Sequence, residues 1–122
     1  MRRILVVDDN EDARELVKKI LKKQGYEIIE AVDGEDAIVK AVAYRPDLIL
    51  MDISIPKIDG YEVTKRLKSR VDFKNVPIIA FTAHAMKGDQ EKALEAGCDG
   101  YISKPINVRD FPEQIKFYLK EK

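Results

Sequence analysis

Two kinds of hydrophobic pattern alternate along this sequence. Short, continuous apolar runs rich in β-branched residues alternate with longer stretches in which apolar positions recur every three or four residues. Three of the short runs, at residues 4–7, 48–51 and 78–81, show no polar alternation. This is typical of strands that are covered on both faces of a parallel sheet. The pattern predicts strands at residues 3–7, 26–31, 48–51, 78–81 and 101–103.

The longer stretches predict five amphipathic helices. Asn10 and Asp33 are placed to cap the first two helices. Gly25 lies just past the end of the first helix, and Pro46 stops the second. The apolar helix faces are formed by Ala13, Leu16, Val17, Ile20 and Leu21; Ala37, Ile38, Ala41 and Val42; Tyr61, Val63 and Leu67; Ala93 and Leu94; and Phe111, Ile115, Tyr118 and Leu119. Side chains expected in or near the core are Phe73, Phe81, Cys98, Phe111 and Phe117.

The start of the last helix is ambiguous. If Asn107 were the N-cap, Pro112 would lie inside the helix, and its missing N–H would leave a helical carbonyl unpaired. If Asp110 is the N-cap, Pro112 falls in the first turn, where proline is tolerated, and Glu113 completes a capping box. We therefore expect a tight or irregular turn before Asp110.

The alternation of strand and helix, repeated about five times, predicts an α/β fold. Each strand–helix–strand unit is expected to form a right-handed crossover, which gives a parallel sheet with helices on both faces. A closed barrel of eight such units typically needs about 250 residues, so the sheet is expected to be open. The doubly wound, flavodoxin-like order 2-1-3-4-5 is the common solution for five strands.

The composition fits one soluble domain over residues 1–122. Because 22 basic side chains balance 22 acidic ones, bulk attraction to nucleic acid or to an anionic membrane is not expected. The single Cys98 cannot form an internal disulfide, and with the single His84 it makes a zinc site improbable. No stretch approaches the roughly 20 apolar residues that span a bilayer. We therefore expect a cytoplasmic protein.

Polar side chains follow four of the predicted strands. Asp8 and Asp9 follow the first strand, and Asp52 follows the third. Thr82 follows the fourth strand, and Lys104 follows the fifth. Each residue alone has an ordinary explanation as a helix cap or a surface charge. In the order 2-1-3-4-5, however, these four strands are neighbours, and ligands of open α/β sheets bind beyond the carboxyl ends of strands. We expect the set to converge in one pocket.

The residue types in this set favour phosphoryl chemistry with Mg²⁺. Neighbouring carboxylates repel one another unless positive charge intervenes, and Lys104 supplies one such charge. Oxygen ligands without histidine or cysteine favour a hard cation such as Mg²⁺. A carboxylate can attack phosphorus, and a metal and a lysine can neutralise the transferred charge. Asp52, which follows a fully apolar strand, is the best nucleophile candidate, and the Thr82 hydroxyl can donate to a phosphoryl oxygen.

The sequence resembles the receiver domain of the two-component response-regulator family along its whole length. The matching segments are VDDN at residues 7–10, DLILMDISIPKIDG at residues 47–60, FTAHA at residues 81–85 and AGCDGYISKPI at residues 96–106. Within the family it is similar to single-domain cell-division regulators of the DivK type, chiefly through TAHAMKGD and GCDGYISKPI. The resemblance implies a CheY-like fold and a phosphoryl-accepting signalling switch.

The resemblance also implies the metal site and the phosphoacceptor. Asp52 would accept the phosphoryl group. Asp8 and Asp9 would hold Mg²⁺, Asp9 directly and Asp8 partly through water. Asp52 itself and the backbone carbonyl of Ser54 would be further ligands. Ser54 and His84 occupy positions that vary in the family and tune dephosphorylation, so the resemblance leaves the lifetime of the phosphoryl group open.

The remaining roles concern the switch. The resemblance implies that Thr82 binds the phosphoryl group and that Lys104 forms an ion pair with it. It implies a cis peptide bond between Lys104 and Pro105. Tyr101 would be the aromatic residue whose orientation follows that of Thr82. Phosphorylation would then change the surface formed by the fourth helix, the fifth strand and the fifth helix.

The partners implied by the resemblance are a histidine kinase or a histidine phosphotransfer protein, and a downstream protein that binds the changed surface. The expected chemistry is self-phosphorylation and self-dephosphorylation, without turnover of an external substrate. If the chain is a complete gene product, its output passes through protein contact or onward phosphotransfer. If it is part of a longer protein, this conclusion does not follow.

The main alternative is a Mg²⁺-dependent phosphohydrolase with an aspartate nucleophile. Enzymes of the haloacid-dehalogenase type carry a D-x-D motif at the first strand, and Asp8-Asp9 lacks that spacing. A flavodoxin-like FMN carrier needs a phosphate-cradling loop after the first strand, where Asp8, Asp9 and Asn10 would repel phosphate. A P-loop enzyme is excluded because the sequence contains no G-x-x-x-x-G-K-[ST] motif.

Overall fold

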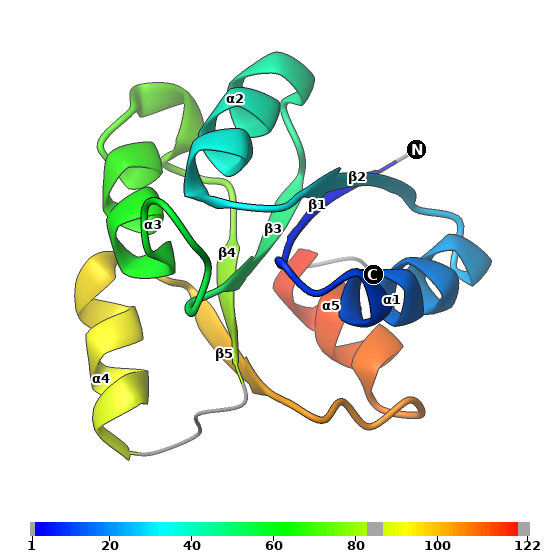
Figure 1. The fold of residues 1–122 in the computed structure, drawn as a ribbon. Helices are drawn as coiled ribbons and strands as arrows, with labels where there is room; N and C mark the ends of the chain where they lie inside the picture. Colours follow the sequence, from blue (N-terminus) through cyan, green and yellow to red (C-terminus); the bar gives the residue numbers. More distant parts are fainter. Residues whose placement is uncertain (1, 83–86, 120–122) are drawn as a thin grey trace.

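Five parallel strands form one sheet in the computed structural model, which describes residues 2–82 and 87–119. The strands are β1 (Arg3–Val7), β2 (Glu27–Ala31), β3 (Leu48–Asp52), β4 (Ile78–Thr82) and β5 (Gly100–Ser103). They lie side by side in the order β2-β1-β3-β4-β5 (Figure 1). Every neighbouring pair is parallel, which confirms the predicted fold class and strand order.

Helices cover both faces of this sheet. They are α1 (Glu11–Lys23), α2 (Gly34–Tyr44), α3 (Gly60–Lys68), α4 (Lys87–Ala96) and α5 (Phe111–Leu119), and a short 3₁₀ helix (Val71–Phe73) precedes β4. In Figure 1, α2, α3 and α4 lie on one face, and α1 and α5 lie on the other. The hydrophobic core is therefore divided by the sheet into two clusters, as the prediction of helices on both faces requires.

Alternate residues of each strand supply the two clusters. In β1, Leu5 and Val7 pack on the side of α2, α3 and α4, while Ile4 and Val6 pack on the side of α1 and α5. All residues of β3 and of β4 are buried. Because both faces of these strands are covered, an apolar side chain is favoured at every position. The first polar side chain of β3 is therefore Asp52, at its carboxyl end.

The predicted N-caps of the first two helices are confirmed. The side chain of Asn10 accepts a hydrogen bond from the N–H of Ala13 (2.9 Å), and that of Asp33 accepts one from the N–H of Asp36 (2.7 Å). Each cap satisfies a backbone donor that has no partner within its helix. Helix α2 ends two residues before Pro46, because the residue that precedes a proline disfavours the helical conformation.

The turn expected before the last helix is present. The side chain of Asn107 accepts hydrogen bonds from the N–H groups of Arg109 (3.0 Å) and Asp110 (3.2 Å). Helix α5 begins at Phe111, so Pro112 lies in its first turn. Proline is tolerated there because the first N–H groups of a helix have no partner within the helix.

Three apolar side chains that were predicted to face the core or a helix interface are exposed instead. The exposed fractions are 46% for Leu16, 62% for Leu94 and 75% for Phe117. On α5 the buried positions Phe111 and Ile115 are four residues apart, and Phe117 falls on the opposite side of the helix. The prediction for Phe117 was wrong because it followed from residue type and not from position around the helix.

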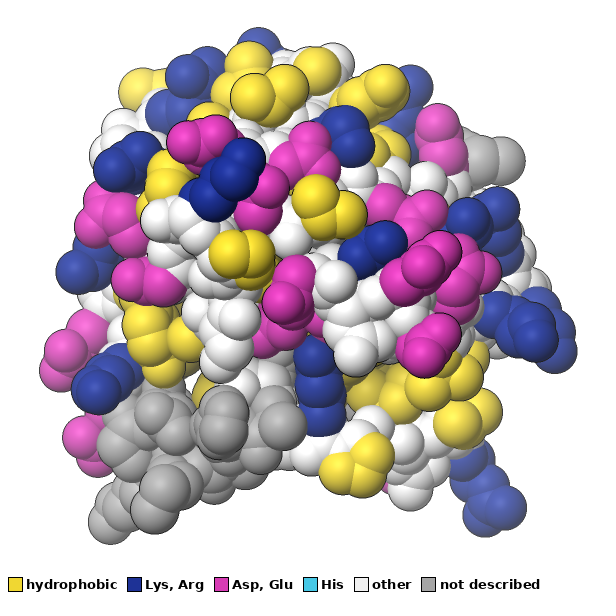
Figure 2. All heavy atoms as spheres, in the orientation of Figure 1, with side chains coloured by type: hydrophobic (Ala, Val, Ile, Leu, Met, Phe, Trp, Pro, Cys, Tyr) yellow, Lys and Arg dark blue, Asp and Glu magenta, His cyan; other side chains and the backbone are white. Residues whose placement is uncertain are grey.

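The molecular surface carries both signs of charge. Figure 2 shows acidic and basic side chains interspersed over the face that Figure 1 presents. This mixture matches the formal net charge of zero, and it gives the visible face no extended field of one sign. Among the helices of the described residues, none is both long enough and apolar enough to cross a bilayer.

Replacing Phe111 with alanine is expected to lower the free energy of unfolding by about 3–5 kcal/mol, because the buried ring would leave a cavity. Phe117→Ala, on the same helix, is the matched control. It is expected to cost about 1 kcal/mol or less, because its exposed ring makes an edge contact with Tyr118 at the surface. Urea unfolding measures both values, and equal losses would contradict the burial described for α5.

Candidate functional site

The carboxyl ends of β1 and β3 bring three aspartates together. Val7 and Met51 are partners in the parallel register, so Asp8 and Asp52 follow side by side. Carboxylate oxygens of Asp8, Asp9 and Asp52 all lie within 4.8 Å of one another. Asp8 and Asp52 are buried, whereas Asp9 is exposed. The structure therefore places the three predicted carboxylates in one cluster at the edge of the sheet.

Asp8 is held through four of its polar atoms. Its Oδ1 accepts a hydrogen bond from the N–H of Asn10 (2.9 Å), and its Oδ2 accepts one from Nζ of Lys104 (2.7 Å). Its own N–H donates to the carbonyl of Ala31 (3.1 Å). Its carbonyl accepts from Nη1 of Arg14 (2.7 Å). Both the carboxylate and the backbone of Asp8 are therefore fixed in orientation.

Asp52 lies in an environment that disfavours its ionised form. Burial is the main cause that raises the pKa of Asp52 above its ordinary value, and the nearby Asp8 adds to it. The N–H of Ser54, which donates to Oδ1 (3.0 Å), and the charge of Lys104 act in the opposite direction. The second oxygen, Oδ2, lies 3.4 Å from Nζ of Lys104. A further positive charge at this cluster would favour the carboxylate form.

Lys104 supplies a positive charge to both buried carboxylates. Burial opposes its charge, but the hydrogen bond to Asp8 and the attraction of Asp52 outweigh burial and raise the pKa of Lys104. Its Nζ also lies 4.9 Å from the centre of the Phe81 ring, a cation–π contact. The peptide bond between Lys104 and Pro105 is cis. The ammonium group thus lies between two carboxylates and an aromatic face.

Thr82 and Tyr101 lie on neighbouring strands and on the same face of the sheet. Thr82 ends β4, is buried and is the register partner of Ser103 in β5. Tyr101 lies two residues before Ser103, is partly buried and packs against the hydrophobic cluster beneath α2, α3 and α4. His84 lies outside the described residues, so its implied influence on dephosphorylation stays a prediction.

The loop between β3 and α3 carries Ser54 along the edge of the cluster. This loop packs closely against the start of α2, where the N–H of Gly34 donates to the carbonyl of Pro56 (3.2 Å). A side chain at Gly34 would meet the backbone of Ile58, so glycine is required by the close approach of the two segments. This packing fixes the backbone on which the Ser54 carbonyl lies.

The donor atoms of the cluster fit a hard divalent cation. All three side chains offer carboxylate oxygens, which are the ligands that Mg²⁺ prefers in proteins. Asp8 and Asp52 are buried like charges that share the ammonium group of Lys104. A divalent cation would compensate the charge that remains, and Asp9 is the one exposed carboxylate of the three.

Two contacts of this site were not predicted. Phe81 was expected in the core, where its ring does lie, but that ring also supports Lys104. Arg14 had no expected role, and its guanidinium reaches the carbonyl of Asp8. Both contacts depend on how separate elements pack in space. Arg14 is the fourth residue of α1, and a residue there carries no local signal that its side chain will reach back to a strand end.

An open, doubly wound sheet with an acidic pocket and a lysine at its carboxyl edge defines the class of CheY-like receiver folds. The family described as "Response regulator receiver domain" matches residues 4–116. The chain therefore belongs to the response-regulator receiver family.

Comparison with known proteins gives close relatives over nearly the whole chain. The sequence is 47% identical over 116 residues to the polar-differentiation response regulator DivK of Brucella anthropi. The aligned region covers 95% of this chain and 94% of that protein. The crystal structure of a putative response regulator from Chloroflexus aurantiacus is similar with a TM-score of 0.93, at 30% identity and over 98% of both chains. The receiver domain of the sensor histidine kinase PA1611 from Pseudomonas aeruginosa, with a magnesium ion coordinated in its active site cleft, has a TM-score of 0.90, at 33% identity and over 98% of both chains.

These findings establish the general function. The chain is a receiver domain of a response regulator and acts as a signalling switch in two-component systems. Receiver domains bind Mg²⁺ in the acidic pocket that the three aspartates form here. They receive signals from histidine kinases and pass them to downstream targets. The alternative of a Mg²⁺-dependent phosphohydrolase is not favoured by these relatives.

Asp52→Asn is expected to raise the free energy of unfolding at neutral pH in buffer without Mg²⁺. Because the folded-state pKa of Asp52 is raised above its unfolded value, ionisation of this group destabilises the folded state. That destabilisation is complete above the folded pKa and vanishes below the unfolded pKa of about 4. Urea unfolding at about pH 7 and about pH 3 should show a gain for the asparagine variant only at the higher pH. A loss of stability at neutral pH would contradict this account.

Proposed function

We propose that Asp52 accepts a phosphoryl group from a histidine kinase or a histidine phosphotransfer protein, in a reaction that requires Mg²⁺. The position of Asp52 carries this proposal. Asp52 ends the central strand β3, with Asp8 on one side and Lys104 3.4 Å from its Oδ2. Both oxygens of Asp8 accept hydrogen bonds of 2.9 Å or shorter. Among the residues that the structure describes, Oδ2 of Asp52 has only the long contact with Lys104.

The transfer is a displacement at phosphorus. Oδ2 of Asp52 forms the new P–O bond while the bond between phosphorus and the donor's histidine nitrogen breaks, and that nitrogen keeps the electron pair. The N–H of Ser54 holds Oδ1 during this step, so the carboxylate presents its other oxygen. Lys104, already 3.4 Å from Oδ2, is placed to pair with an oxygen of the added group.

The metal would be held by the acidic cluster. When bound, Mg²⁺ supplies positive charge that neutralises the phosphoryl oxygens during transfer. Asp8, Asp9 and Asp52 would provide side-chain oxygens, and Ser54 would provide its backbone carbonyl. The N–H of Asn10 orients the carboxylate of Asp8 through Oδ1, which is the kind of supporting contact that tunes metal sites.

Thr82 and Tyr101 would convert phosphorylation into a change of surface. The Thr82 hydroxyl donates to a phosphoryl oxygen and moves toward Asp52, and Tyr101 then turns toward the space that Thr82 leaves. A reversal of populations from about 1:99 to 99:1 requires about 5.5 kcal/mol of differential interaction. A few charge-assisted hydrogen bonds of about 1.5–3 kcal/mol each can supply it. The surface of α4, β5 and α5 would change in consequence.

The chain would therefore act as a switch and not as an enzyme with an external substrate. Its own chemistry would be limited to gaining and losing one phosphoryl group. A downstream protein would bind the changed surface of α4, β5 and α5. We place this activity in the cytoplasm, because the fold depends on no disulfide and the thiol of Cys98 is buried.

Asp52→Asn is expected to abolish phosphorylation of the protein by acetyl phosphate in the presence of Mg²⁺, because the amide is not a competent nucleophile. Intact-protein mass spectrometry measures the added phosphoryl group. Asp12→Asn, which removes an exposed carboxylate from the first turn of α1, is the control and should be labelled like the wild type. Chelation of Mg²⁺ should abolish labelling of the wild type. Undiminished labelling of Asp52→Asn would exclude Asp52 as the acceptor.

Thr82→Ala is expected to accept a phosphoryl group on Asp52 from acetyl phosphate. Its Tyr101 is expected not to respond to phosphorylation, because the hydroxyl that links the phosphoryl group to β4 is missing. The measurement is the change in Tyr101 ring and amide NMR signals when Mg²⁺ and beryllofluoride, a phosphoryl mimic, are added. Thr82→Ser keeps a hydroxyl and should keep most of the response. An undiminished Tyr101 response in Thr82→Ala would refute the switch role of Thr82.

A further inference from the structure

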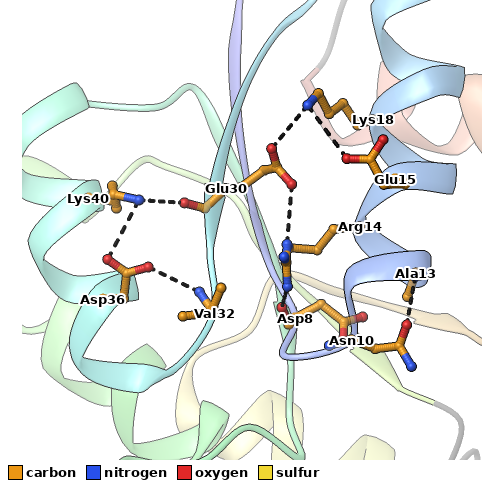
Figure 3. Close-up of polar contacts among 10 residues, drawn as sticks. All are labelled: Asp8, Asn10, Ala13, Arg14, Glu15, Lys18, Glu30, Val32, Asp36 and Lys40. Atoms are coloured by element: carbon orange, nitrogen blue, oxygen red, sulfur yellow. Dashed lines mark hydrogen bonds and ion pairs between the residues drawn. The ribbon is translucent and has the colours of Figure 1, made fainter.

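Arg14 joins the acidic cluster to the end of β2. Its Nη1 donates to the backbone carbonyl of Asp8 (2.7 Å), and its Nε donates to Oε1 of Glu30 (3.2 Å), as Figure 3 shows. The Arg14 side chain is only 12% exposed. Because both nitrogens belong to one rigid guanidinium plane, the contact ties the positions of its two acceptors together. A side chain of α1 thus connects the β1–α1 loop to a neighbouring strand.

Glu30 is a firm anchor for this contact. Its Oε2 accepts a hydrogen bond from Nζ of Lys18 (3.2 Å), and its backbone carbonyl accepts one from Nζ of Lys40 (2.7 Å), which is paired in turn with Asp36 (3.6 Å). Burial raises the pKa of Glu30, but the hydrogen bonds from Lys18 and Arg14 outweigh burial and lower it. The carboxylate is therefore ionised at neutral pH, and helices on both sides hold the strand end that carries it (Figure 3).

The carbonyl that Arg14 holds belongs to the peptide unit between Asp8 and Asp9. Strand β1 ends at Val7, so this carbonyl lies beyond the regular ladder of the strand. A peptide unit is planar, and fixing its carbonyl also fixes the direction in which the chain continues. The backbone of Asp9 is thereby oriented, although Asp9 itself is exposed.

We propose that Arg14 is a positioning residue of the metal site, which fixes the Asp8–Asp9 peptide unit and so presets Asp9 for binding Mg²⁺. Arg14 would touch neither the metal nor the phosphoryl group, since it acts through the backbone of Asp8. The inference rests on the proposed function, because it requires Mg²⁺ to bind at the acidic cluster.

The sign of the effect separates positioning from simple electrostatics. Arg14 is a cation next to an acidic cluster, so on electrostatic grounds alone its removal would strengthen the binding of Mg²⁺. If Arg14 positions the ligands, its removal weakens binding instead. Loss of a contact that supports metal ligands typically lowers metal affinity about 10–100-fold.

The test is a titration of the full chain with Mg²⁺, followed by ¹H–¹⁵N NMR without a phosphoryl donor. Arg14→Ala is expected to raise the apparent Kd for Mg²⁺ about tenfold or more. Arg14→Lys keeps the charge and the aliphatic stem, but one ammonium group cannot replace the planar fork, so it should also bind Mg²⁺ more weakly. If Arg14→Ala does not fold, the Mg²⁺ affinity of Arg14→Lys decides the test.

Lys18→Ala is the matched control. It removes a cation from the same Glu30 but leaves the contact between Arg14 and Asp8 intact. Its Kd for Mg²⁺ should stay within about twofold of the wild type, because a partly exposed ion pair contributes little. Circular dichroism of each variant checks that all are folded.

A second readout distinguishes positioning from general damage. At saturating Mg²⁺, Arg14→Ala should recover most of the wild-type rate of labelling by acetyl phosphate. The variant should differ from the wild type in needing a higher Mg²⁺ concentration to reach that rate. Arginine variants that bind Mg²⁺ as tightly as Lys18→Ala, or more tightly, would overturn the positioning role while the proposed function stands. A wild-type chain that binds no Mg²⁺ would overturn the proposed function and this inference with it.

Discussion

Two buried carboxylates that share one lysine are the constraint on which the functional end of this molecule depends. Asp8 and Asp52 lie side by side because β1 and β3 are neighbours in register, and Lys104 contacts both. Burying like charges is unfavourable unless cations and hydrogen bonds compensate. The ammonium group and the surrounding N–H groups provide part of this compensation. What remains is an acidic pocket suited to a divalent cation and, through it, to a phosphoryl group.

The rest of the fold can be understood as support for this arrangement. Apolar side chains on both faces fix the central strands, so their ends meet at one edge of the sheet. From there, backbone contacts orient the carboxylates: the N–H of Asn10 holds Asp8, and the N–H of Ser54 holds Asp52. Arg14 extends the support to β2, and Phe81 extends it to Lys104. A site that must present its charges to a metal is thus built on rigid elements, which reduces the reorganisation needed during reaction.

Much of this arrangement could be predicted from the sequence, because strand ends in a parallel sheet are marked by the first polar residue after an apolar run. That signal located Asp8 and Asp52, and strand order then placed them together. The exposure of Phe117 could not be predicted from residue type, since it depends on the phase of α5 around its axis. The contact between Arg14 and Asp8 also escaped prediction, because it depends on how α1 crosses the sheet.

The most direct test of the central claim is to locate the phosphoryl group chemically. After incubation with Mg²⁺ and acetyl phosphate, borohydride reduction converts an acyl phosphate on aspartate into homoserine, which tandem mass spectrometry assigns to a residue. We expect homoserine at position 52 and intact aspartate at positions 8 and 9. Homoserine at position 8 or 9, or at none of the three, would contradict the account.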